Sequence, residues 1–312
     1  MRLLVFSDIH NNMDAVRALR QQEANEYDAV IVAGDIGSET AHQFFEVLDT
    51  FLCPVFYVYG NWDNELSYSS AHSTRCVRIH NNILPHGGYF FTGFSGCLTH
   101  WGKNPVYMEE KETILKNHAP IVATLAEAKT NATKLALSIE KKFKLQETDL
   151  LKHEIALSIK GHSKARVKLH QWRKVQLRQA WQPVSKLEAS REHRIYIKDV
   201  DACYKRTLVL NRAALIHEIK TSCVAQDRLI VVTHERLFRF ADEGVFPLLH
   251  VFGHRHEFKY TQHLGIHYLN AAALDTESFS GNPDMGGYCK VELVHGQVNV
   301  ERRHIEASLI KT

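Results

Sequence analysis

The chain has 312 residues, 45% of them hydrophobic, which is enough for one large domain or two small ones with a sizeable core. Its formal net charge is only +3. No apolar run approaches the roughly 20 residues of a membrane-spanning helix, and the N-terminal run ending at Phe6 is too short for a signal peptide, so the sequence predicts a cytoplasmic protein.

The first hundred residues alternate short apolar runs with amphipathic stretches, a pattern typical of strands joined by helices. Buried strands are predicted at Met1–Phe6, Asp28–Ala33 and Pro54–Tyr59. Helices are predicted between them at Met13–Asn25 and Ala41–Phe51. Shorter strands follow at Val77–Ile79 and Gly88–Phe94.

The region from Lys103 to about Ala225 differs in composition, because helix formers dominate it. Between Lys103 and Ser222 there are 24 Lys and Arg against 13 Asp and Glu, whereas the rest of the chain has 14 against 22. A basic segment between acidic flanks indicates an anionic partner for that segment. We predict a basic helical insertion at 103–225, which divides a core into a first part at 1–102 and a second part at 226–312.

The insertion is predicted to be a long helical hairpin with shorter helices. From Pro120, apolar residues follow a 4-3-4-3-4 spacing: Ile121, Leu125, Ala128, Ala132, Leu135 and Ile139. This seam packs either within the insertion, which we favour, or against a second copy of the chain in a homodimer. A second helix is predicted at Lys160–Arg178, with Pro183 ending it, and a third at Tyr204–Ile219.

The second predicted helix is strongly basic. It has no acidic residue, and His170 and Trp172 lie among its cations. A solvent-exposed helix face is one interpretation, and contact with nucleic acid is the other. The candidate nucleic-acid-binding residues are Lys160, Lys164, Arg166, Lys168, Trp172, Arg173, Lys174 and Arg178.

The strand pattern resumes after the insertion. Strands are predicted at Asp227–Val232, Leu248–Phe252 and Ile266–Leu269, followed by a hairpin of Gly287–Leu293 and Gln297–Arg302. The six cysteines are scattered without a C-x-x-C pair, so we expect buried thiols, Cys97 among them, rather than disulfides or a zinc ribbon.

Five predicted strands end in polar residues that suit metal coordination. These residues are Asp8, His10, Asp35, Asn61, His234, His254 and His256. In open α/β sheets, ligands bind outside the carboxyl ends of the strands. A mixed nitrogen and oxygen set suits Mn, Fe, Zn or Co, and seven ligands suit two ions that share a bridging carboxylate.

The motif order D-x-H, G-D-x-G, G-N-x-D, T-H and G-H-x-H resembles that of the calcineurin-like metallophosphoesterases, over residues 1–100 and 226–305. The resemblance implies an α/β fold, a four-layer α-β-β-α sandwich, interrupted here by the helical insertion. It also implies two divalent transition-metal ions, Mn first and Fe, Zn, Co or Ni as alternatives. A hydroxide between the ions would attack phosphorus in line.

The same resemblance implies a role for each ligand residue. Asp8, His10 and His256 would hold the first metal. Asn61, His234 and His254 would hold the second. Asp35 would bridge the two ions.

The third motif departs from the family pattern, because Trp62 stands where a histidine is usual. An indole cannot donate a proton at neutral pH, so another residue would have to protonate the leaving group. Asp63, His86 and His100 are the candidates, and Asn61 and His234 are expected to act in catalysis from the metal centre. Trp62 itself would stack a nucleobase or form a wall of the pocket.

Three functions remain open from the sequence. The favoured one is a metal-dependent phosphodiesterase that acts on nucleic acid or a nucleotide, with the insertion gripping the substrate. The second is a phosphatase or small-nucleotide hydrolase with the insertion as a cap. The third is a metal-binding scaffold that docks partners through the insertion.

Overall fold

The structure is a computed structural model that describes residues 1–23, 26–69, 72–156, 164–276 and 282–310. The chain forms two compact units, one of Met1–Glu109 with Cys203–Thr312 and the other of Glu110–Ala202. The chain changes unit inside helix α3 (Pro105–Asn117) and again inside helix α6 (Arg191–Thr221).

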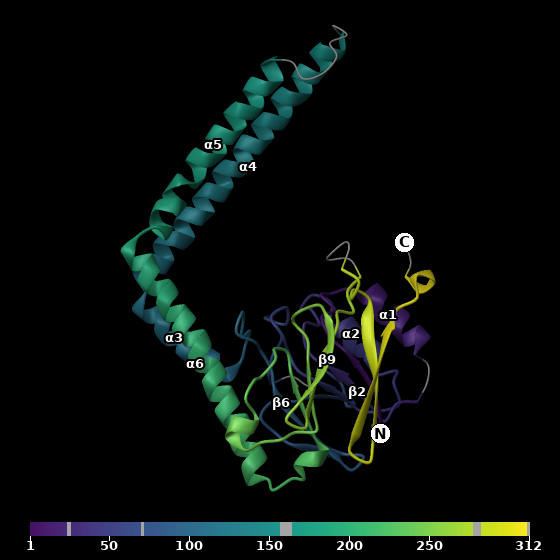
Figure 1. Cartoon of the computed structure of the whole chain (residues 1–312). Helices are drawn as coiled ribbons and strands as arrows, with labels where there is room; N and C mark the ends of the chain where they lie inside the picture. The colour runs from purple at the N-terminus through teal and green to yellow at the C-terminus, as the bar shows by residue number, and fades with distance from the viewer. Residues whose placement is uncertain (24–25, 70–71, 157–163, 277–281, 311–312) are drawn as a thin grey trace. The chain divides into compact units, whose positions relative to one another are not determined.

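The first unit contains two six-stranded mixed sheets (Figure 1). The first sheet has the order β12 (Gln297–His304), β11 (Gly287–Val294), β1 (Arg2–Phe6), β2 (Ala29–Val32), β3 (Val55–Tyr57) and β4 (Cys76–Arg78). The second has the order β5 (Leu84–His86), β6 (Tyr89–Phe94), β7 (Leu229–Thr233), β8 (Leu249–Phe252), β10 (Ile266–Ala271) and β9 (Phe258–His263). Strands β1 to β4 are parallel to one another, as are β6, β7, β8 and β10.

The alternation of side chains along β1 shows how the layers form. Leu3 and Val5 lie in an apolar core with Ile230 and Val251 of the second sheet. Leu4, on the other face of β1, packs with residues of helices α1 (Met13–Gln22) and α2 (Ala41–Leu48). The two sheets therefore face each other with helices outside the first sheet, which confirms the predicted α/β sandwich with a helical insertion.

Some element boundaries differ from the sequence prediction. Helix α2 ends at Leu48 rather than Phe51, because the Thr50 hydroxyl donates to the Val47 carbonyl and the chain turns there. The antiparallel edge strands β5 and β9 were not predicted from the sequence. Short edge strands carry a weak alternation signal, and a proline in β5 lowers it further.

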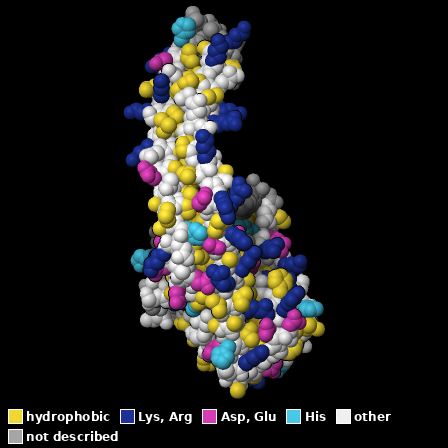
Figure 2. All heavy atoms as spheres, turned by 90° about the vertical axis from the view of Figure 1, so that its left-hand side faces the viewer, with side chains coloured by type: hydrophobic (Ala, Val, Ile, Leu, Met, Phe, Trp, Pro, Cys, Tyr) yellow, Lys and Arg dark blue, Asp and Glu magenta, His cyan; other side chains and the backbone are white. Residues whose placement is uncertain are grey.

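In the second unit, helices α4 (Ala119–Ala156) and α5 (Lys164–Glu188) pack against each other. Leu125 and Ala132 of the predicted seam are buried with Val184 of α5, whereas Leu135 is 51% exposed. Figure 2 shows hydrophobic side chains on the hairpin surface with Lys and Arg beside them. The seam thus packs within the insertion over part of its length, and a homodimer through it stays a prediction.

The prediction that Pro183 ends a helix is wrong, because Pro183 lies inside α5. A proline in a helix interior loses one backbone hydrogen bond. Its neighbours Ala180 and Val184 are buried, so tertiary packing of α5 compensates for that loss. The predicted helix at Tyr204–Ile219 is confirmed within α6. Within the first unit, the Trp101 indole donates to the Tyr204 carbonyl oxygen at 3.2 Å.

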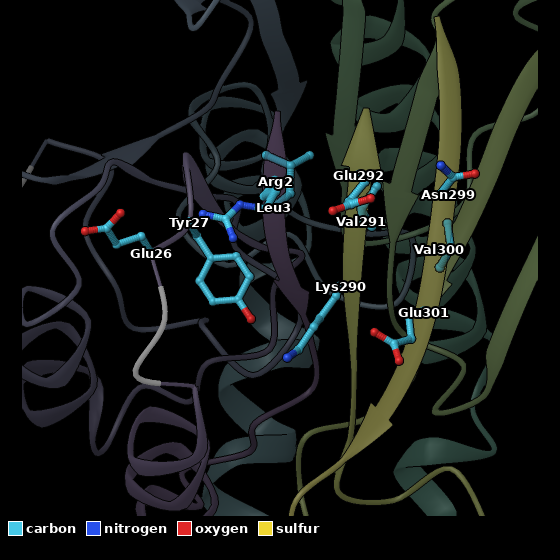
Figure 3. A pocket seen from close by; sticks show the side chains of 10 residues that line it. All are labelled: Arg2, Leu3, Glu26, Tyr27, Lys290, Val291, Glu292, Asn299, Val300 and Glu301. Atoms are coloured by element: carbon cyan, nitrogen blue, oxygen red, sulfur yellow. The ribbon is translucent and has the colours of Figure 1, made fainter. Parts of the chain in front are cut away.

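All six cysteines are free thiols, and five are buried as predicted, while Cys223 is exposed, contrary to the prediction. The backbone there turns after α6 with φ of 53°. No helix among the described residues is long and apolar enough to cross a membrane. A pocket of about 360 Å³ lies at the amino end of β1 beside β11 and β12, where Arg2, Tyr27, Lys290 and Glu301 line it (Figure 3).

Acid should destabilise the protein partly through His250 on β8. Burial, with the nearby Arg236 charge, lowers the pKa of His250 from its usual 6.5 to about 3. Between pH 6.5 and 3 the unfolded chain therefore binds a proton at His250 that the folded chain excludes. The contribution of neutral His250 to the free energy of unfolding is fully present above pH 6.5 and is lost as the pH falls to 3.

We expect His250→Phe to flatten the acid limb of the stability curve. Between pH 6 and 4 the slope of the unfolding free energy should fall by about 1.4 kcal/mol per pH unit, because one titrating group is removed. Urea unfolding at several pH values measures this slope. If the free energies of unfolding of wild type and His250→Phe change with pH at the same slope, the fold does not lower the pKa of His250.

Candidate metal centre

The carboxyl ends of β1, β2, β3, β7 and β8 bring the seven predicted ligand residues to one edge of the sandwich. Asp8 follows β1 by two residues, and His234 directly follows β7. Five of the seven have left-handed backbone conformations, with φ between 49° and 71°: Asp8, His10, Asp35, His254 and His256. Such conformations are strained for these residue types and are concentrated at functional sites.

Two groups of ligand atoms form around the carboxylates. In the first, His256 Nε2 lies 3.3 Å from Asp8 Oδ1, and His10 Nε2 lies 3.9 Å from the same oxygen. In the second, Asp35 Oδ2 lies 3.4 Å from His10 Nε2 and 3.2 Å from His234 Nε2. Asp35 therefore lies between the predicted ligands of the two metals, as the bridging assignment requires.

The Nδ1 contacts of two imidazoles suit metal coordination. His10 Nδ1 lies 3.1 Å from Asp275 Oδ2, and His234 Nδ1 lies 2.8 Å from the Ala33 carbonyl oxygen. When each Nδ1 donates its hydrogen there, each Nε2 presents a lone pair toward the carboxylates. His10 Nε2 is buried without a hydrogen-bond partner among the described residues, as expected for an atom that awaits a cation.

The pKa values of the buried histidines reflect the negative charge of the neighbouring carboxylates. Burial lowers the pKa of His10, but the nearby carboxylates of Asp275 and Asp35 outweigh it and raise the pKa to about 9. Burial also opposes the charge of His234, yet Asp35 raises its pKa well above 6.5. In the metal-free protein, protons on these imidazoles compensate for the buried carboxylates, and a divalent ion would displace them.

The Asn61 side-chain oxygen lies among the predicted ligands of the second metal. Its Oδ1 is 3.3 Å from His234 Nε2 and 3.2 Å from His254 Nδ1. An amide oxygen and two imidazole nitrogens that converge in this way can hold a transition-metal ion. The donor set of both groups therefore fits two divalent cations.

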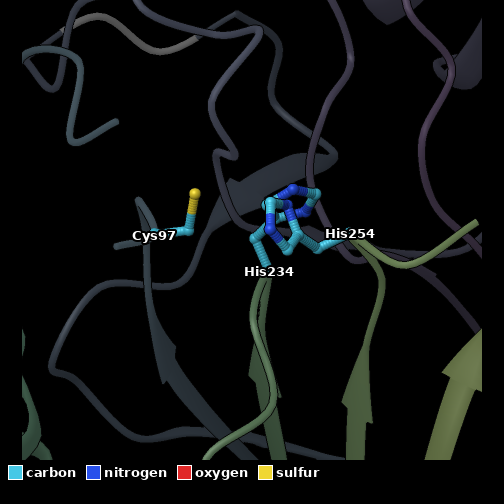
Figure 4. Close-up of side chains that lie close together, drawn as sticks. All are labelled: Cys97, His234 and His254. Carbon is cyan, nitrogen blue, oxygen red and sulfur yellow. The ribbon is translucent and has the colours of Figure 1, made fainter. Parts of the chain in front are cut away.

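Cys97, which the sequence analysis assigned to the core, lies beside this second group (Figure 4). Its Sγ contacts Asn61 Oδ1 at 3.4 Å, and its ligand atom lies within 4.8 Å of those of His234 and His254. Burial raises the pKa of its thiol. Its place three residues after β6 was the available signal, because β6 ends at the same edge as β7.

Asp275 was also missed. It follows β10, whose carboxyl end reaches this edge as well, and its second oxygen accepts from Asn12 Nδ2 at 3.0 Å. Asp275 thereby connects the His10 imidazole to Asn12, the N-cap residue of helix α1. Its position after the strand Ile266–Ala271 offered the same signal as the other strand-end residues.

Asp63 holds two motif loops together. Its Oδ1 accepts from the Gly37 N–H at 2.8 Å, and its Oδ2 accepts from the Gly60 N–H at 2.7 Å. Burial, together with the Asp35 charge, raises its pKa to about 7. That value suits a proton donor, but both oxygens are engaged by backbone amides, so the structure gives Asp63 a positioning role, and its role as an acid stays a prediction.

The other candidate acids lie in different surroundings. His86 Nε2 contacts the Asp28 carbonyl oxygen, before β2, and the structure does not bring His86 to the metal ligands. His100 Nδ1 accepts from the Gly102 N–H at 2.9 Å, in the turn that begins at Cys97. Of the two, only His100 belongs to a loop that reaches the site.

Trp62 borders the metal ligands. Its backbone N–H donates to Asp35 Oδ1 at 2.8 Å, and its indole lies 4.7 Å from the His10 ring, centroid to centroid. The side chain is 47% exposed. It therefore offers an accessible aromatic face next to the predicted bridging carboxylate.

The basic residues of the insertion are only partly available for a ligand. Arg173 donates to Glu140 Oε1 from Nε and Nη2, and the Lys142 ammonium lies over the Trp172 ring. Lys164, Lys168, Lys174 and Arg178 are exposed on α5, and Arg166 is half-buried. Lys160 lies outside the described residues.

The chain matches the family model described as "Calcineurin-like phosphoesterase superfamily domain" over residues 1–163. The chain belongs to the calcineurin-like phosphoesterase superfamily. This membership agrees with the sandwich fold and with the seven predicted ligands at its edge. The curated proteins contain no match to this chain.

Solved structures that match the chain share little sequence with it. A predicted phosphoesterase from Streptococcus pneumoniae is 11% identical over 97% of each chain, with a TM-score of 0.33. Phosphopantetheinyl hydrolase from Mycobacterium tuberculosis is 14% identical over 87% of this chain and 88% of that one, with a TM-score of 0.39. Vps29 from Entamoeba histolytica, complexed with zinc, is 11% identical over 98% and 100%, with a TM-score of 0.32.

Proposed function

We propose that the protein is a metal-dependent phosphodiesterase that acts on nucleic acid or a nucleotide. The observation that carries the proposal is Asp35 Oδ2, which lies within 3.4 Å of His10 Nε2 and 3.2 Å of His234 Nε2, between two groups of metal-ligand atoms. Two bound divalent ions, Mn²⁺ in the first instance, would activate water and stabilise negative charge on the phosphoryl oxygens.

The protein side chains hold and orient this centre. Asp8 accepts from the His254 N–H with both oxygens, at 3.1 and 3.0 Å, which fixes the loop after β8 against the end of β1. Asn61 Oδ1 and His234 Nε2 lie close together and would hold the second metal ion. Burial of Asp8, Asp35 and His234 keeps bulk water from these contacts and strengthens them.

With Trp62 at this position, the enzyme should prefer esters with good leaving groups. An indole supplies no proton to a departing alkoxide, and no titratable side chain replaces it at this position. The exposed aromatic face favours a planar group near the phosphate, such as a nucleobase or an aryl ring.

We expect Trp62→His to change this preference. The rate on an alkyl phosphodiester should rise about tenfold or more relative to the rate on an aryl phosphodiester, since general acid catalysis contributes about 10²–10⁴-fold in favourable cases. Rates on a series of esters with leaving groups of graded pKa test this. An unchanged slope of rate against leaving-group pKa would mean that the proton comes from elsewhere.

The exposed cations of α5 support a polymeric substrate. Lys164, Lys168 and Lys174 present their charges on a helix without acidic residues before Glu188. If they bind a phosphate backbone, affinity for DNA or RNA falls steeply with salt. Retained hydrolysis of small esters without salt-sensitive binding would favour the alternative, a phosphatase or small-nucleotide hydrolase.

The direct test uses metal-stripped protein and bis(p-nitrophenyl) phosphate. Turnover should appear with Mn²⁺ and exceed that on p-nitrophenyl phosphate, a monoester. Faster turnover of the monoester would favour a phosphatase. Metal binding without turnover of any phosphoester would leave the third function, a scaffold.

A further inference from the structure

A pocket of about 210 Å³ lies beside the metal centre, and no role described above uses it. The loop after β8 contributes Gly253 and His254 to its lining, so the pocket is adjacent to a predicted ligand of the second metal. Arg236, after β7, and Asn270, on β10, line it from the outer side of the second sheet.

Asn270 presents an unsatisfied amide at this pocket. The residue is only 1% exposed, and neither Oδ1 nor Nδ2 has a hydrogen-bond partner among the described residues. Buried polar atoms are hydrogen-bonded in nearly all native proteins, so two unpaired atoms on one side chain indicate a missing ligand. The amide offers two N–H donors and an oxygen acceptor.

Arg236 also has an unsatisfied hydrogen-bond donor. Its guanidinium carbon lies 4.5 Å from the ring centroid of Tyr268 and 4.9 Å from that of Phe238. Its Nε is buried without a hydrogen-bond partner, and no carboxylate of a described residue lies within ion-pair distance. The aromatic rings cover the faces of the guanidinium, so its edge donors are left for an anion.

The remaining charges around the pocket favour an anion as well. Arg255 and Lys259 also line it, and neither forms an ion pair within the described part of the chain. Two carboxylates, Glu235 and Glu257, belong to the lining too. The Leu98 N–H donates to Glu235 Oε2 at 3.0 Å and partly satisfies that carboxylate. Three cations therefore face two carboxylates, one of which has a partner.

We propose that this pocket binds a second phosphoryl group of the substrate, next to the one that is hydrolysed. The inference rests on the proposed phosphodiesterase function and extends it. Arg236 supplies paired donors to the phosphoryl oxygens, and Asn270 Nδ2 adds a third. The second phosphoryl group comes either from a nucleoside diphosphate or from the next phosphate of a nucleic-acid strand.

Binding of pyrophosphate to the metal-stripped protein, measured by calorimetry, tests the pocket without any turnover. Arg236→Met keeps the aliphatic packing against Tyr268 and removes the charge, and it should weaken binding about tenfold or more. Lys259→Glu, an exposed change, should weaken it as well. Arg239→Met, in the same loop but outside the pocket, is the matched control and should have no effect.

Inhibition of bis(p-nitrophenyl) phosphate hydrolysis then identifies the source of the second phosphate. A lower inhibition constant for ADP than for AMP indicates a diphosphate, and a lower one for 5′-phosphorylated d(TpT) than for d(TpT) indicates a strand. Arg236→Met should remove either difference and leave turnover of the aryl ester unchanged.

The outcomes separate the two proposals. Pyrophosphate binding that Arg236→Met and Lys259→Glu leave unchanged would overturn the phosphoryl subsite, even if the enzyme hydrolyses phosphodiesters. Absence of turnover on every phosphoester would overturn the proposed function, and the calorimetric comparison alone would then decide whether the pocket binds phosphate.

Discussion

Replacing Asp35 with alanine should abolish metal-dependent hydrolysis, with a loss in kcat/KM on the order of 10³-fold or more, because this carboxylate lies between both groups of metal ligands. Burial would raise the pKa of Asp35, but His234 and His10 hold it below its usual range, so the carboxylate is ionised throughout the neutral range. Its loss leaves both imidazoles without their shared anion.

The same substitution should reduce the number of bound metal ions per chain. Asp35 Oδ1 also accepts the Trp62 N–H, so Asp35→Asn, which keeps an oxygen at this position, separates loss of charge from loss of the loop contact. Asp14→Ala, on the exposed side of α1, is the matched control. Retained turnover in Asp35→Ala with an intact fold would contradict the bridging role.

Gly60→Ala should reduce metal affinity about 100-fold or more without adding or removing any charge. A Cβ at Gly60 would overlap Asp35 Oδ1 and would stand 2.7 Å from His234 Cδ2. Real Cβ atoms do not approach other atoms so closely, so the bridging carboxylate or the imidazole must move. A small displacement of a metal ligand is enough to lose most of its contribution.

Metal titration of Gly60→Ala, followed by calorimetry, measures this effect. The control is Gly265→Ala, where a Cβ would meet no atom within 4 Å although φ is 78°, so it reports the backbone cost alone. Thermal unfolding of the metal-free proteins shows whether the fold survives. Equal metal affinity in Gly60→Ala and wild type would mean that the loop relaxes without moving Asp35.

The sequence was sufficient to group the predicted ligands that lie at the ends of buried strands. Asp8 and His234 follow short apolar runs, and parallel strands place their carboxyl ends at one edge of a sheet, so the sequence alone predicts that these residues lie together. Cys97 and Asp275 could have been found by the same reasoning. They were missed because neither directly follows its strand: Cys97 lies three residues after β6, and Asp275 lies four residues after β10, which runs two residues beyond its predicted end.

Other features depend on three-dimensional contacts that no local pattern reports. Pro183 continues a helix because buried neighbours stabilise α5. Asp63 binds two backbone amides 26 and 3 residues away, which only the folded loops bring together. Residues from separate strands and loops line the pocket at Asn270. No local sequence pattern reports that the Asn270 amide is unpaired there.

Titration of the metal-stripped protein with Mn²⁺, with bound metal and hydrolysis of bis(p-nitrophenyl) phosphate measured on the same samples, tests the two-metal centre most directly. We predict that two ions bind per chain and that turnover rises with their occupancy. Binding of one ion or none by folded protein, or full occupancy without hydrolysis of any phosphoester, would contradict it.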